Sequence, residues 1–283
     1  MHLSRRNFIK LSIPAILLPL ICRSSIVNAK PAETHPSFSP KSGSKAIYYD
    51  ALKCEGCHYC ETACWTVHDS SFTEVRIKEN NNNDTNELLF WKFQCMHCSD
   101  ATCVNVCPVG ALSHNELGFV DYDKDKCIGC GYCAEFCPFQ VPHMNGSKIT
   151  GIQQMEKCGF CADLIADGQQ PACAAACTKD ALVFGDRDQL VIAGKKRVEE
   201  LKETYPNINL YGESELNGLH LICLLPEPPG FYGLPEDPQV PLAANVWQDV
   251  LKPVGYALGG LTILVLAVNY FIARVNTRVE RER

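Results

Sequence analysis

The chain has 283 residues, a formal net charge of −6 and a hydrophobic content of 46%. This length allows one large domain or two modest ones, and the acidic balance argues against a nucleic-acid partner. The eighteen cysteines are the anomaly: Cys22 and Cys223 lie apart, and the other sixteen fall between Cys54 and Cys177.

The N-terminus predicts an export signal over residues 1–29. A charged start is followed by the apolar run LSIPAILLPLIC and by a cleavage pattern that ends at Ala29. The pair Arg5 and Arg6 resembles the twin-arginine export motif. A chance arginine pair would not account for the apolar run and the cleavage site. Residues 30–45, rich in proline, serine and charge, predict a flexible leader.

The sixteen clustered cysteines form four groups of four. Groups one and three share the spacing x2, x2, x3, and groups two and three are each followed by proline. In chain order the groups are Cys54, Cys57, Cys60 and Cys64; Cys95, Cys98, Cys103 and Cys107; Cys127, Cys130, Cys133 and Cys137; and Cys158, Cys161, Cys173 and Cys177.

This spacing predicts iron–sulfur clusters. Three cysteines in a C-x2-C-x2-C turn aim three thiolates at three irons of one cubane, and the fourth cysteine ligates the other cluster of a pair. Sixteen cysteines divided in this way predict four [4Fe–4S] clusters with no cysteine left over. Zinc sites need only two paired CxxC units, a disulfide framework would not repeat one ligand spacing, and a redox sensor uses one or two thiols.

The clusters and the export signal explain each other. Outside the cytoplasm, free thiols normally become disulfides. Clusters are assembled in the cytoplasm, so the protein must cross the membrane already folded. The twin-arginine route carries folded cargo, which makes it the expected route for this chain.

Residues 46–185 are predicted to form the four-cluster domain. Within it, the polar insertion ENNNNDTNE separates groups one and two, and the stretch ALSHNELGFVDYDKDKC, residues 111–127, predicts a short hairpin around an Asn-Glu-Leu-Gly turn. Residues 186–225 predict a helix and a strand that complete the domain, with Asp186 at the start of the helix.

The C-terminal part predicts a membrane anchor. Residues 226–252 carry six prolines in their first sixteen positions and predict either extended chain leading to the membrane or a disordered linker. The aromatic residues Phe231 and Tyr232 within them favour docking on another surface. Residues 253–274 predict one transmembrane helix, because twenty uncharged residues span about 30 Å. Residues 275–283 predict a basic cytoplasmic tail, which leaves the cysteine domain outside.

These quartets resemble a known family, the four-cluster ferredoxin-type subunits of membrane-bound respiratory oxidoreductases. The stretches QCMHCSDATCVNVCPVGAL, DYDKDKCIGCGYCAEFCPFQVP and KCGFCADLIADGQQPACAAAC match its quartets. The tail GFYGLPEDP followed by one helix is similar to that of formate dehydrogenase β subunits and of the ferredoxin-like subunit of hydrogenase-2 type enzymes. The implied fold class is α+β: tandem bacterial-ferredoxin-like dicluster modules, with small β-hairpins and short helices around the clusters, and one C-terminal transmembrane helix.

The resemblance implies four interleaved ligand sets, because the family pairs groups one and four and pairs groups two and three. Set one is Cys54, Cys57, Cys60 and Cys177; set two is Cys158, Cys161, Cys173 and Cys64; set three is Cys95, Cys98, Cys103 and Cys137; set four is Cys127, Cys130, Cys133 and Cys107.

The predicted function is electron transfer with no catalytic residue in this chain, since no nucleotide-binding glycine loop or nucleophile constellation stands out. The resemblance implies a catalytic partner, either a molybdopterin formate dehydrogenase or a nickel–iron hydrogenase, and an integral membrane cytochrome b or quinone-reactive subunit. It implies a single-pass protein of the inner membrane with its clusters on the periplasmic side. The alternatives are the electron-input subunit of a molybdopterin-type terminal reductase, a self-contained enzyme and a metal-stabilised structural protein.

Three residues near the cysteines carry secondary hypotheses. His58 and His97 lie between cysteines, and because sixteen cysteines already suffice, both are interpreted as residues beside the clusters or on the surface. Trp65 stands where groups two and three have proline. It is interpreted either as excluding water from a cluster or as ordinary packing.

Overall fold

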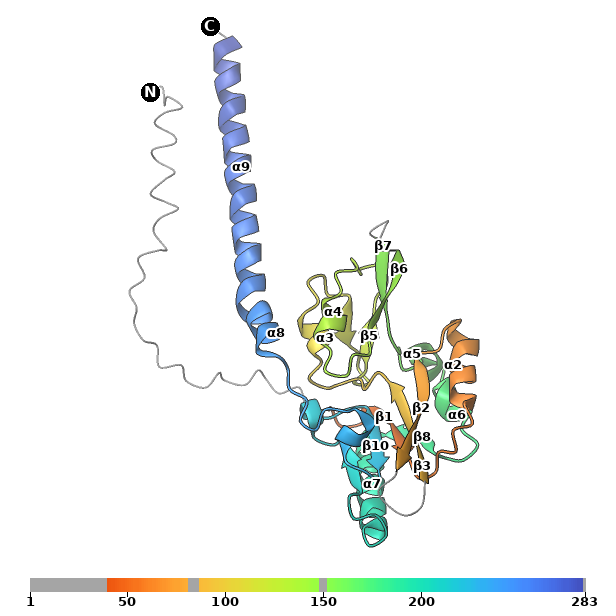
Figure 1. Cartoon of the computed structure of the whole chain (residues 1–283). Coiled ribbons are helices and arrows are strands. Elements are labelled where there is room, and N and C mark those ends of the chain that lie inside the picture. The colour runs from red at the N-terminus through yellow and green to blue at the C-terminus, as the bar shows by residue number, and fades with distance from the viewer. Residues whose placement is uncertain (1–39, 81–86, 148–151, 282–283) are drawn as a thin grey trace, which may run out of the picture. The chain divides into compact units, whose positions relative to one another are not determined.

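The computed structural model describes residues 40–80, 87–147 and 152–281 (Figure 1). The predicted signal peptide, most of the predicted leader and most of the polar insertion lie outside these residues. Within them the chain combines helices and strands, as predicted. The division into two tandem modules stays a prediction.

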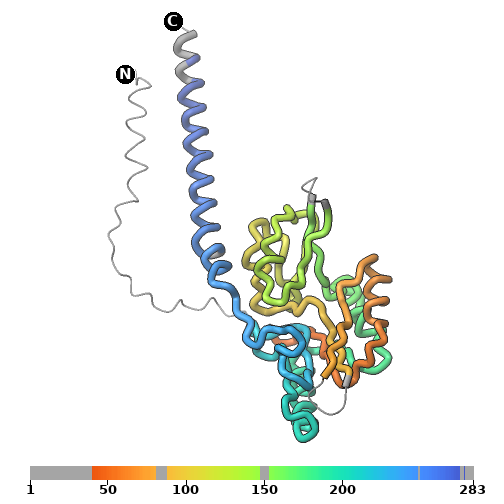
Figure 2. Tube along the Cα trace, in the orientation of Figure 1, coloured from red at the N-terminus to blue at the C-terminus, as the bar shows by residue number. Residues whose placement is uncertain are grey.

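A four-stranded sheet joins the two ends of the cysteine region. In spatial order its strands are β8 (Leu182–Asp186), β1 (Lys45–Asp50), β10 (Leu221–Leu225) and β9 (Asn209–Tyr211). β1 pairs parallel with β10 and antiparallel with β8, so segments far apart in the sequence lie side by side (Figure 2). The apolar run of β10 is fully buried, as a strand covered on both faces requires.

Helix α7 (Arg187–Leu201) packs on this sheet, as the helical spacing predicted. Asp186 caps it by accepting a hydrogen bond from the Asp188 N–H at 3.2 Å. Leu190 packs with Tyr48 and Ile222 of the sheet in one apolar cluster. The segment after group four therefore completes the fold around β1.

Hairpins and short helices carry the cysteine groups. The hairpins pair β2 (Thr73–Asn80) with β3 (Glu87–Gln94), β4 (Leu112–His114) with β5 (Val120–Tyr122), and β6 (His143–Ser147) with β7 (Ile152–Glu156). The β4–β5 hairpin is the one that the sequence predicted. The short helices are α2 (Tyr59–His68), α3 (Thr102–Asn105), α4 (Tyr132–Glu135), α5 (Ala162–Ala166) and α6 (Ala172–Ala175).

The proline-rich segment is neither extended throughout nor a free linker. Residues Pro229–Tyr232 form a 3₁₀ helix, η3, and the side chains of Tyr232 and Leu234 are buried in the main core. The ring of Tyr232 lies 5.7 Å from that of Trp91. Docking prevails over extension here because the apolar side chains between the prolines bury surface in the core.

The C-terminal segment is helical over α8 (Leu242–Val246), the π-helical turn η4 (Trp247–Leu251) and α9 (Lys252–Arg281). By length and composition, Leu242–Arg274 is able to cross a membrane, and it is the one such helix in the part of the chain that the structure describes. Its mean hydropathy reaches 1.8.

Candidate iron–sulfur sites

The first cavity is lined by all four cysteines of set one, together with Tyr49 of β1 and Lys92 of β3. Three of the cysteines come from the loop before α2 and its first turn, and Cys177 follows α6. Gly56 allows the loop to bend so tightly. Its φ is 69°, and a Cβ there would lie 2.2 Å from the ring of Phe90.

The second cavity is lined by all four cysteines of set two. Cys64 lies on α2 and Cys173 on α6, and these two helices pack against each other. The Phe72 N–H donates to Cys64 Sγ at 3.3 Å, and His68 Nε2 lies 3.3 Å from Cys161 Sγ. Hydrogen bonds to sulfur are one of the means by which proteins set cluster potentials.

The sulfurs of set three lie close enough together for their charges to interact. Burial raises the pKa of Cys98 well above its ordinary value, and Cys95, Cys103 and Cys137 raise it further. Cys95 and Cys98 follow β3, Cys103 lies on α3, and Cys137 comes shortly after α4. An isolated antiparallel β-bridge between the backbones of Cys98 and Leu219 attaches this loop to the residues before β10.

Set four is brought together in the same way. Burial raises the pKa of Cys133 to about 11, and the nearby sulfurs of Cys130, Cys127 and Cys107 add to the shift. Cys133 lies on α4, which begins after Gly131 in the left-handed conformation, with φ of 79°.

The four sets form a row, because sulfurs of consecutive sets also lie close enough for their charges to interact. Set one is next to set two, set two next to set three, and set three next to set four. The linking pairs are Cys60 with Cys173, Cys158 with Cys95, and Cys103 with Cys133. At the two ends of the row, Cys57 of set one and Cys130 of set four are exposed, whereas the other fourteen ligand candidates are buried or half-buried.

The donor set fits iron–sulfur clusters. Burial raises the pKa of Cys60, Cys133 and Cys161 to about 11, because burial disfavours a charged thiolate unless a positive charge lies beside it. Iron supplies that charge, and soft thiolates in fours are the ligands of [4Fe–4S] clusters. Within the described ranges, no three His, Cys, Asp or Glu side chains converge closely enough to hold a single metal ion.

The structure places the three residues of the secondary hypotheses, His97, His58 and Trp65, in different surroundings. His97 is fully buried rather than on the surface, and its Nδ1 accepts a hydrogen bond from the Val120 N–H at 3.1 Å. His58 is half-exposed and lies 3.0 Å from Glu61. Trp65 is 59% exposed, so the interpretation that it packs in a core is wrong, whereas the hypothesis that it excludes water from a cluster stays a prediction.

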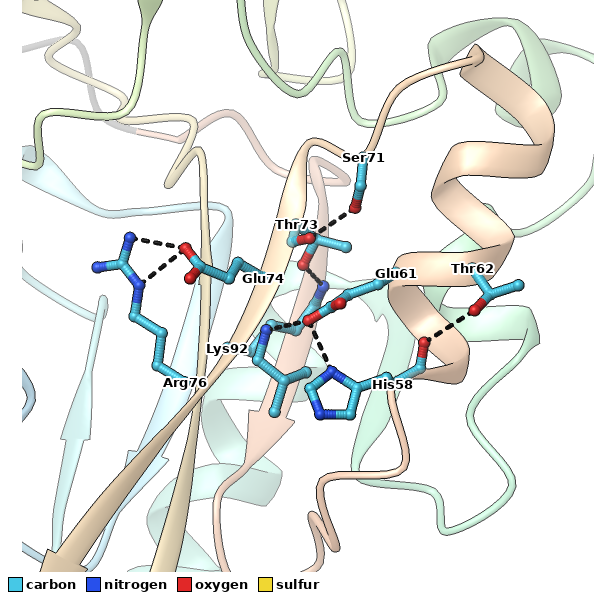
Figure 3. Close-up of polar contacts among 9 residues, drawn as sticks. His58, Glu61, Thr62, Ser71, Thr73, Glu74, Arg76 and Lys92 are labelled. Atoms are coloured by element: carbon cyan, nitrogen blue, oxygen red, sulfur yellow. Dashed lines mark hydrogen bonds and ion pairs between the residues drawn. The ribbon is translucent and has the colours of Figure 1, made fainter.

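The sequence pattern did not predict that two lysines are buried near the cysteines. Lys92 and Lys157 are 1% and 5% exposed. Lys92 donates to the Thr73 hydroxyl (Figure 3), while Lys157 donates to the carbonyls of Val120 at 2.6 Å and Cys158 at 3.0 Å. A signal for Lys92 was present, because it interrupts the apolar run LLFWKF.

Comparisons with known proteins also indicate an iron–sulfur protein. A family model described as a 4Fe-4S dicluster domain matches residues 86–187. The formate dehydrogenase iron-sulfur subunit of Haemophilus influenzae is 36% identical, over 77% of each chain. The thiosulfate reductase electron transfer subunit PhsB of Salmonella typhi is 38% identical, over 60% of this chain and 93% of its own. The hydrogenase-2 operon protein HybA of Escherichia coli O157:H7 is 30% identical, over 93% of this chain and 95% of its own.

Identity of this level over most of both chains, together with the cysteine-lined cavities, shows the family. The chain belongs to the ferredoxin-type iron–sulfur electron-transfer subunits of respiratory oxidoreductase complexes, the family of the formate dehydrogenase iron-sulfur subunits and HybA.

Proposed function

We propose that this chain holds four [4Fe–4S] clusters, one in each cysteine set, and conducts electrons from one end of the row to the other. The cavities that bring together all four cysteines of set one and of set two carry the proposal, and the charge interactions between consecutive sets support their order. Each cluster, when bound, takes up and releases one electron. The cysteines hold the irons, and the surrounding core keeps water from the inner sets. The chain itself performs no substrate chemistry.

The two ends of the row have different roles in this proposal. Electrons enter at set one, where Cys57 is exposed, and leave at set four, where Cys130 is exposed. Set four lies beside the start of α9: Lys252 Nζ donates to the Cys107 carbonyl at 3.3 Å, and the Tyr256 hydroxyl donates to the Pro108 carbonyl at 3.1 Å. These contacts support an exit toward the membrane.

The helix Leu242–Arg274 anchors the chain in the inner membrane in this proposal, with the cluster domain on the periplasmic side. Arginines follow the apolar run, which supports a cytoplasmic tail, and the arginine pair Arg5 and Arg6 supports export of the folded domain. The partner in the membrane is an integral cytochrome b or another quinone-reactive subunit.

The catalytic partner is a molybdopterin formate dehydrogenase, as the similarity to the Haemophilus influenzae subunit supports. A nickel–iron hydrogenase is the second candidate. HybA matches 93% of this chain, and an export signal of the chain's own favours the hydrogenase type. Similarity to PhsB supports a third arrangement, in which electrons run from quinol to a terminal reductase.

The test uses the native complex, solubilised mildly from membranes without oxygen, while the iron–sulfur absorbance is followed. Bleaching by formate and not by hydrogen is the expected result. Bleaching by hydrogen alone would place the chain beside a hydrogenase. Clusters that are reduced by quinol and recover their colour on addition of thiosulfate would identify a terminal reductase. If the protein contained no iron–sulfur absorbance at all, the function itself would be refuted.

A further inference from the structure

Lys92 is a buried cation between sets one and two. It lies in β3 with 1% of its side chain exposed, and it lines the cavity of set one. Its ammonium donates a hydrogen bond to Thr73, which lines the cavity of set two. Lys92 is therefore positioned to act on both sets.

The ammonium of Lys92 has no carboxylate partner in the described part of the chain. Its hydrogen-bond partner is the neutral hydroxyl of Thr73 (Figure 3). Glu61, drawn in the same close-up, accepts a hydrogen bond from the Val75 N–H and pairs with His58 at 3.0 Å. Because a buried charge is costly unless an opposite charge compensates it, Lys92 needs an anion nearby.

The cysteine sulfurs provide that anion once they are the thiolate ligands of a cluster. Lys92 lines the same cavity as all four cysteines of set one, and its partner Thr73 lines the cavity that holds all four cysteines of set two. The buried ammonium and the thiolate ligands therefore stabilise each other's charges.

We propose that Lys92 is a fixed positive charge shared by the clusters of sets one and two, and that it raises the reduction potentials of both. The inference rests on the proposed function, since it requires clusters in these two sets. Reduction adds one negative charge to a cluster. A buried ammonium stabilises the reduced form more than the oxidised form, because the low dielectric of the core screens it little.

Two other lysines near the proposed clusters do not combine burial with a single neutral hydrogen-bond partner. The ammonium of Lys157 donates to two backbone carbonyls, which occupy much of its hydrogen-bonding capacity. Lys179 also lines the cavity of set one, but its side chain is 49% exposed and pairs with Glu55 at 2.8 Å. Lys179 is therefore a matched control: the same residue type beside the same cysteines, but screened by solvent and by a carboxylate.

The experiment is a redox titration of the purified native complex, followed by electron paramagnetic resonance, with iron content measured on each sample. Lys92→Met and Lys92→Gln remove the charge, and Lys92→Arg keeps it. In both neutral variants we expect the reduced-to-oxidised ratio of two clusters at a fixed potential to fall about tenfold, or ~59 mV for a one-electron couple. Lys92→Arg and Lys179→Met should leave all four midpoints near their wild-type values.

Two results would overturn the proposal: unmoved midpoints in both neutral variants, or an arginine variant that shifts as far as the methionine variant. If the neutral variants lose iron while Lys92→Arg retains it, the charge is required for the clusters to bind, which supports the counter-charge. Loss of iron in all three would show that the shape of lysine matters and not its charge. A wild-type protein without clusters in sets one and two would refute the proposed function instead.

Discussion

The two halves of the cysteine region repeat one ligand pattern in different surroundings. In the first half, sets one and two are mounted on α2 and α6, and the cysteines Cys64 and Cys177 precede a tryptophan and a threonine. In the second half, sets three and four are mounted on the four-residue helices α3 and α4, and Cys107 and Cys137 precede prolines. The two halves share the cysteine pattern but differ in the residues around the cysteines.

This difference separates two properties of an iron–sulfur protein. Ligand spacing determines which group is bound. Groups one and three share it, and groups two and four differ only in the length of the middle spacer. The surroundings determine potential and tolerance to change, and these surroundings are particular to each half. Lys92, in the first half, is a buried ammonium with one neutral hydrogen-bond partner. Lys157, between the halves, donates to the carbonyls of Val120 and of Cys158. Matched substitutions in the two halves therefore test whether their surroundings differ.

The largest effect is expected from removing one ligand in each half. Cys60→Ser and Cys133→Ser replace buried cysteines whose pKa values burial raises equally, to about 11. Each variant should lose one cluster, or about four of about sixteen irons per chain, because a [4Fe–4S] cluster needs four thiolates. Electron flow from donor to quinone should stop in both, because the row is broken at one end or the other. Iron analysis and quinone reduction check this, and full activity in either variant would contradict the row.

Next in size is a comparison of equivalent glycines. Gly56 and Gly129 occupy the same position in groups one and three, both with positive φ. A Cβ at Gly129 would lie 2.1 Å from the backbone carbonyl of Gln153, whereas at Gly56 it would meet the side chain of Phe90 at 2.2 Å. A ring can turn and a backbone cannot. We therefore expect Gly129→Ala to cost about 4 kcal/mol and Gly56→Ala about 2 kcal/mol.

The control for this pair is Gly131→Ala, where φ is 79° and a Cβ would meet nothing within 4 Å. It should cost only the left-handed backbone energy, about 1 kcal/mol. Denaturant unfolding of the three variants, with clusters loaded, measures the order. Equal losses at Gly56 and Gly129 would mean that the surroundings of the two turns are equivalent after all.

A smaller effect is expected at Arg187, which fastens the segment that supports set three. Its guanidinium is buried and donates to the carbonyls of Leu219, Gly212 and Glu213, each at 2.9 Å. Arg187→Met should ease local opening by about 2 kcal/mol, or roughly 30-fold faster iron release to a chelator from the second half. Lys196→Met, on the exposed side of the same helix, is the control and should release iron at the wild-type rate.

The smallest effect is expected at Trp65. Because this side chain is 59% exposed, Trp65→Ala should change the unfolding free energy by less than about 0.5 kcal/mol. It should also leave all cluster midpoints unchanged in the same redox titration of the native complex. A clear shift in one midpoint would instead support the hypothesis that this tryptophan excludes water from a cluster.

The features that the sequence predicted well are local ones. Cysteine spacing predicts the chemistry because a cubane needs a tight turn, and helix α7 and the β4–β5 hairpin follow from side-chain periodicity. The parallel pairing of β1 with β10 was not predicted, because no local pattern records which strand a distant strand will join. Lys92 was missed for a related reason. The role of a lysine in an apolar run becomes visible only when the cysteines around it, which come from groups one and four at opposite ends of the cysteine region, are brought together.

The proposed interleaving of the ligand sets also fixes the order in which the sets can be completed during translation. Every ligand of sets three and four has been translated once Cys137 is made, and these eight cysteines lie within one short stretch of chain. Sets one and two stay incomplete until Cys173 and Cys177 emerge and return to a loop that was made at the start. During translation, the second half therefore has all of its cluster ligands before the first half does. A chain interrupted between the third and fourth cysteine groups would carry every ligand for two clusters and an incomplete set for the other two.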